Sequence, residues 1–108
     1  MSEQLASAVD RYIELAESWG NAMNEPDSTT ANALYDKIQP VYQEILKSRQ
    51  ETDLFDRADA ASDPVAFFIA SHMKEQDRER AIKHYERLAQ SPFPFVAVSA
   101  QVILDLMK

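Results

Sequence analysis

The side chains that could do chemistry are few in this chain. Its two histidines, His72 and His84, are twelve residues apart and fall on different predicted helices. Neither belongs to a pair of histidines, or a glutamate and a histidine, at the spacing that holds a metal on one helix face. We therefore expect His72 to be a partly buried helix residue and His84 to lie on the surface. Neither is expected to bind a metal or to act in catalysis.

Other catalytic arrangements are also missing. The absence of cysteine excludes disulfides, thiolate metal sites and cysteine nucleophiles. Gly20 is the only glycine, so the chain has no glycine-rich loop for a phosphate. Asp10, Glu14 and Glu17 could serve acid–base chemistry only in a cleft that shifts one pKa, and their spacing predicts a solvated helix face instead. The sequence thus predicts a protein that is not an enzyme and uses no cofactor.

An acidic run is the best candidate contact surface. Asp53, Asp56 and Asp59 follow one another at intervals of three residues, which predicts one side of a helix, and Glu51 lies beside them. This stripe could meet the basic active cleft of a toxin, or it could be an ordinary solvated face. Trp19, next to Gly20, is predicted to be partly exposed and to anchor an interface. The predicted partner-binding residues are therefore Trp19, Glu51, Asp53, Asp56 and Asp59.

The charge of the chain is uneven. The net charge is −7, and residues 1–63 carry 13 acidic and 5 basic side chains, against 5 and 6 in residues 64–108. An acidic half disfavours nucleic acid and anionic membranes, because both require phosphate to be neutralised. It favours a basic protein partner through electrostatic steering, and solubility alone is the other explanation. No stretch is apolar enough to span a membrane, and the N-terminus lacks the apolar segment of a signal peptide, so we expect a cytoplasmic protein.

The elements that would position these residues are helices. With a single glycine the chain is poorly suited to the tight turns of antiparallel sheets. Apolar residues instead recur at intervals of three and four. Ser2 and Asp63 are expected to cap helices, and Pro40 is expected to kink a helix without dividing it. Six helices are predicted, over about residues 2–24, 27–49, 52–60, 64–74, 77–90 and 94–107.

Two proline-led apolar runs suggest a repeat. Pro64 and Pro94 each open a helix dense in valine, phenylalanine and alanine, and a charged helix lies between them. This alternation is typical of stacked helical repeats. The helix predicted over 94–107 has little polar surface, so it should either pack centrally or meet a partner.

These motifs resemble a known group, the short bacterial HEAT-like domains catalogued as domain of unknown function number two-zero-one-nine. One departure is that Val65 is followed by Ala66, Phe67 and Phe68, where HEAT helices often carry an arginine. The resemblance implies a curved stack of antiparallel helices without catalytic activity, and an immunity role by association with toxin genes. The matching segments are Arg11–Ala16, Leu34–Ile38, Glu44–Leu46, Asp63–Val65, Ala70, Ala81, Leu88 and Pro92–Pro94.

The sequence therefore predicts one all-α domain over residues 1–108, built from about six antiparallel helices in a HEAT-like stack. Its predicted function is protein binding without catalysis, as an immunity protein that occludes a basic toxin. The alternative is a structural or adaptor protein that homodimerises through the apolar helix 94–107.

Overall fold

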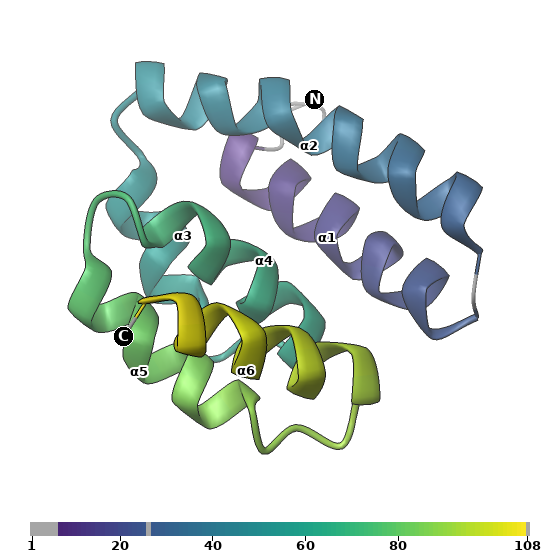
Figure 1. Cartoon of the computed structure of the whole chain (residues 1–108). Coiled ribbons are helices and arrows are strands. Elements are labelled where there is room, and N and C mark those ends of the chain that lie inside the picture. Colours follow the sequence, from purple (N-terminus) through teal and green to yellow (C-terminus); the bar gives the residue numbers. More distant parts are fainter. Residues whose placement is uncertain (1–6, 26, 108) are drawn as a thin grey trace. The chain divides into compact units, whose positions relative to one another are not determined.

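The computed structural model describes residues 7–25 and 27–107 and contains six α-helices (Figure 1). They are α1 (Ala8–Asn24), α2 (Ser28–Lys47), α3 (Glu51–Arg57), α4 (Asp63–Met73), α5 (Arg78–Leu88) and α6 (Pro94–Met107). No strand occurs in these residues, so the predicted all-helical class is confirmed. The chain divides into two compact units, residues 1–54 and 55–108, with the division inside α3 after Leu54.

The first unit is built on α1 and α2, which pack against each other (Figure 1). Each begins with a capping side chain: Ser7 accepts a hydrogen bond from the backbone N–H of Asp10, and Asp27 accepts one from that of Thr30. The predicted cap at Ser2 lies outside the described residues. Tyr12 and Tyr42 are buried with their ring centroids 6.3 Å apart. The other buried side chains include Val9, Ala16, Ile38 and Ile45.

Helix α2 ends in a backbone motif that normally uses glycine. The N–H of Gln50 donates to the carbonyl of Ile45 at 2.9 Å, and the N–H of Arg49 donates to that of Leu46 at 3.2 Å. This pairing requires a left-handed residue after the helix, and Arg49 adopts it with φ of 57°. The predicted helix over 27–49 is one helix through Pro40, but it stops at Lys47.

The second unit is built on α4, α5 and α6, and contacts join each of these helices to the other two. Pro64 lies in the first turn of α4, where its missing N–H costs nothing. The Tyr85 ring is fully buried and meets the Phe67 ring edge-on at 5.9 Å. The core also contains Val65, Ile69, Met73, Leu88, Val96 and Leu104.

Candidate protein-binding surfaces

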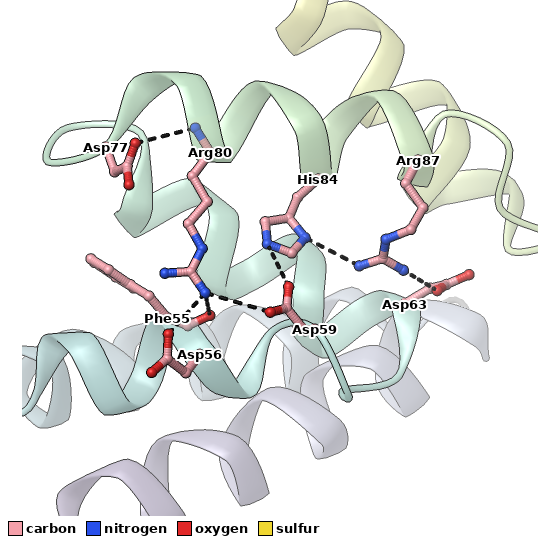
Figure 2. A network of polar contacts seen from close by, with 8 residues as sticks. All are labelled: Phe55, Asp56, Asp59, Asp63, Asp77, Arg80, His84 and Arg87. Atoms are coloured by element: carbon pink, nitrogen blue, oxygen red, sulfur yellow. Dashed lines mark hydrogen bonds and ion pairs between the residues drawn. The ribbon is translucent and has the colours of Figure 1, made fainter.

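A polar network on one side of α5 organises the second unit (Figure 2). Three side chains of α5, Arg80, His84 and Arg87, are spaced by four and three residues, so they lie along one helix face. The partners that they meet are Asp56, Asp59 and Asp63, from the segment running from the end of α3 to the start of α4. Acidic and basic residues far apart in sequence thus neutralise one another.

Arg80 holds the first part of that segment. Its Nη2 lies 3.0 Å from Oδ1 of Asp56 and 3.6 Å from Oδ2 of Asp59. The same nitrogen donates to the backbone carbonyl of Phe55 at 3.2 Å. One guanidinium nitrogen therefore donates hydrogen bonds to the backbone and to Asp56, and lies close enough to Asp59 for an ion pair.

His84 lies at the centre of the network and is buried, with 6% of its surface exposed. Its Nε2 is 3.4 Å from Oδ1 of Asp59. Burial lowers the pKa of His84, the positive charge of Arg87 lowers it further, and Asp59 opposes both. The expectation of a surface histidine is wrong. The sequence spacing does indicate a buried position, because His84 follows the buried Ala81 by three residues and precedes the buried Leu88 by four.

Asp63 joins the start of α4 to the loop after α5. Its Oδ2 accepts a hydrogen bond from the hydroxyl of Ser91 at 2.6 Å, and its Oδ1 is 3.5 Å from Nη1 of Arg87. The prediction that Asp63 caps α4 is wrong. Ser62 occupies the cap position without a side-chain bond, and Asp63 is the first residue of the helix.

The predicted acidic stripe is divided by this arrangement. Helix α3 ends at Arg57 and not at Ala60, so Asp59 lies beyond the helix that was expected to carry it. Asp56 and Asp59 are exposed but are already paired with cations of α5. In the first unit, Glu51 is half-buried and Asp53 is exposed.

Trp19 is less accessible than expected. It was predicted to be partly exposed, but only 9% of its surface is accessible. The aromatic stripe of α1 thus faces inward at this position, and little of the ring is available to a partner. Its predicted role in binding stays a prediction.

The largest exposed apolar side chains of the second unit lie on α6. Val98 is 65% exposed, Val102 53% and Leu106 82%. At intervals of four residues they follow one side of the helix, and we call them the α6 row. The buried side chains of α6, Val96, Ala100 and Leu104, lie on the opposite side at 100° per residue. Helix α6 therefore packs into its unit by one apolar face and presents a second to solvent.

The first unit carries an open depression between α1 and α2, with a volume of about 350 Å³. It is lined by two apolar residues, Leu15 and Val41, and by four polar ones, Arg11, Glu14, Ser18 and Lys37. At its edge Arg11 of α1 pairs with Glu44 of α2. Mixed charge and an open shape give this depression no evident preference for one ligand chemistry.

His72 is half-buried against the ring of Phe68, with ring centroids 5.8 Å apart, as the sequence predicted. Burial, with a smaller contribution from Lys74, lowers the pKa of His72 to about 4. In residues 7–25 and 27–107 no three His, Asp or Glu side chains are arranged to hold a metal ion. Within the same ranges, no helix combines the length and the apolar character needed to cross a bilayer.

Comparison with known proteins does not assign the chain to a family. No family model matches it, and neither the curated proteins nor the solved structures gave a match. Its candidate surfaces are therefore argued from its own residues.

Proposed function

We propose that this chain is a cytoplasmic, non-enzymatic protein-binding module, a HEAT-like stack of antiparallel helices whose docking surface is the α6 row. The observation that carries the proposal is the second apolar face of α6. Single exposed apolar residues are common, but three on one side of one helix form a contiguous patch. Burying such a patch against a partner removes it from water, which is the main driving force of protein association.

The network on α5 supports the choice of this surface over the acidic stripe. Asp56 and Asp59 already face Arg80, so a basic partner would have to compete with an intramolecular cation for them. The α6 row has no such internal competitor. Its side chains are exposed, uncharged and held on a 14-residue helix that is anchored by its opposite face.

A pair of matched variants tests the proposal. Tagged protein is mixed with an untagged copy and with lysate of the source cells, and retained proteins are identified by mass spectrometry. We expect Val102→Glu to abolish retention of a partner, because a charge in the centre of a buried apolar contact is strongly unfavourable. Gln90→Glu adds the same charge at an exposed position after α5, and this control variant should still retain the partner. A partner bound equally by both variants would remove the α6 row from the proposal.

A second candidate function is occlusion of a basic toxin by an immunity protein. It is favoured by the charge of the first unit, in which residues 1–54 carry ten acidic and four basic side chains, a net charge of −6. Glu14, Glu17 and Asp36 are exposed there. The contacts proposed for this function are still Trp19, Glu51, Asp53, Asp56 and Asp59.

This second function makes a different prediction about salt. A basic partner steered by carboxylates should associate more slowly at higher ionic strength, and charge reversal by Asp53→Lys, Asp56→Lys and Asp59→Lys should slow it further. Val102→Glu should leave such binding intact. Binding that is insensitive both to salt and to the three reversals would exclude occlusion through these residues.

A further inference from the structure

We infer that the partner of the α6 row is a second copy of this chain, bound with the two α6 helices antiparallel and crossing at Val102. This inference rests on the proposed function, since it names the occupant of the same surface. In this arrangement Val102 meets its own counterpart, and Val98 of each copy meets Leu106 of the other. The row is thereby buried against itself, as a two-fold interface requires.

The charge distribution favours a second copy. The α6 row contains no charged side chain that would select a complementary heterologous partner. Residues 55–108 carry eight acidic and seven basic side chains, a net charge of −1, against −6 for residues 1–54. Two copies that meet through their second units therefore bring together nearly neutral surfaces, whereas contact through the first units would be opposed by repulsion.

The position of Asp105 selects the antiparallel direction. This exposed carboxylate follows Val102 by three residues, which places it at the edge of the row, and it accepts a hydrogen bond from Gln101 at 3.1 Å. In a parallel pair in register, the two Asp105 carboxylates would lie at the same height and repel. In an antiparallel pair crossing at Val102 they are six residues apart along the axis, about 9 Å at the rise of an α-helix. Opposed helix dipoles favour the same direction.

The size of the row sets the strength of the complex. A stable interface buries roughly 800 Å² on each partner, and one face of a 14-residue helix supplies less. We therefore expect a weak, reversible dimer with a Kd in the micromolar range or above. Covalent cross-linking is then better suited than size-exclusion chromatography to detect this dimer.

Because the chain has no cysteine, a cysteine introduced by substitution is the single thiol that a cross-linker can modify. Four single-cysteine variants are prepared: Val98→Cys, Val102→Cys and Leu106→Cys on α6, and Asn32→Cys, an exposed control on α2. Each is treated alone with a short bismaleimide, and tagged Val98→Cys is also mixed with untagged Leu106→Cys. We expect Val102→Cys alone and the mixed pair to cross-link at least about tenfold faster than the control, because thiols within a complex meet at millimolar effective concentration.

The relative cross-linking rates test whether the two α6 helices are antiparallel, as well as whether the partner is a second copy. Val98→Cys alone should cross-link slowly, because in the antiparallel pair its counterpart lies eight residues away along the axis, about 12 Å. Fast cross-linking of Val98→Cys alone would indicate parallel helices and overturn the inference. Rates equal to that of Asn32→Cys at every position would show that no specific self-association occurs, and would overturn it too.

Failure of this inference is distinguishable from failure of the proposed function. A heterologous partner that is lost in Val102→Glu, together with control-level cross-linking, would leave α6 as a docking surface and exclude the second copy. If Val102→Glu also retained every partner of the wild type, and cross-linking stayed at the control level, the α6 row would not be a docking surface. The substituted α6 positions are all more than half exposed, so the variants are expected to fold, and circular dichroism checks this.

Discussion

Nη2 of Arg87 lies 3.2 Å from Nδ1 of His84, and this contact fixes the state of the imidazole. Arginine has only donors, so Nδ1 must accept and cannot carry a proton. His84 is therefore neutral, with its hydrogen on Nε2, where Oδ1 of Asp59 lies 3.4 Å away. Protonation of Nδ1 would bring two donors face to face and break the contact with Arg87.

Stability should fall as the pH drops below about 6.5. Both histidines have folded-state pKa values below 6.5, that of His72 being about 4, so the unfolded chain takes up protons that the folded chain excludes. The unfolded state then binds more protons, and the free energy of unfolding decreases with falling pH. For His72 alone we expect a loss of about 2 kcal/mol between pH 7 and pH 5, measured by urea unfolding.

Two variants isolate this effect. His72→Gln should remove most of the pH dependence in that window, and His72→Gln combined with His84→Gln should leave almost none, because ordinary carboxylates titrate lower. A wild-type urea midpoint that is equal at pH 7 and pH 5 would contradict the buried environments of both rings.

Replacing Asp59 should affect His84 specifically. Asp59→Asn removes the negative charge that opposes the downward shift, so the pKa of His84 should fall further, as observed by NMR titration of the imidazole. The stability cost should be at most about 1 kcal/mol, because the carboxylate is exposed. Asp56→Asn is the matched control: it loses a similar contact with Arg80 and should leave the His84 titration nearly unchanged. Equal shifts in both variants would argue against the direct pairing of Asp59 with His84.

Removing the hydroxyl of Tyr85 should not destabilise the protein. This oxygen is buried and has no hydrogen-bond partner among the described residues, and burial raises its pKa. Tyr85→Phe keeps the edge-on contact with Phe67 and removes an unsatisfied polar group, so we expect a change between zero and about 1 kcal/mol of stabilisation. Tyr85→Ala should instead cost about 3–5 kcal/mol through the cavity it leaves. Thermal unfolding separates the two. A clear loss of stability in Tyr85→Phe would mean that the hydroxyl has a partner in solution.

Glycine should be better than arginine at position 49. A left-handed conformation costs a residue with a Cβ roughly 1 kcal/mol, and glycine avoids that cost. Arg49→Gly should therefore raise the free energy of unfolding by up to about 1 kcal/mol, whereas Arg49→Ala should give no gain. If alanine stabilises as much as glycine, the effect comes from the arginine side chain and not from the backbone.

Much of the helical framework could be predicted locally. Proline in the first turn, aspartate before a helix and apolar residues at intervals of three and four act through neighbours in sequence, which is why Asp27, Asp77 and Pro94 mark helix starts correctly. The same local patterns did not predict the role of Asp63. Its carboxylate contacts Ser91 and Arg87, which lie 28 and 24 residues later in the chain.

Local patterns were enough to predict that the chain is helical, where most of its helices lie and that α6 has too many apolar residues for one buried face. They could not predict that Asp56 and Asp59 pair with α5, that His84 is buried or that Val98, Val102 and Leu106 remain exposed. Helix formation depends on residues within one or two turns, whereas pairing and burial depend on which distant side chains the packed helices bring together.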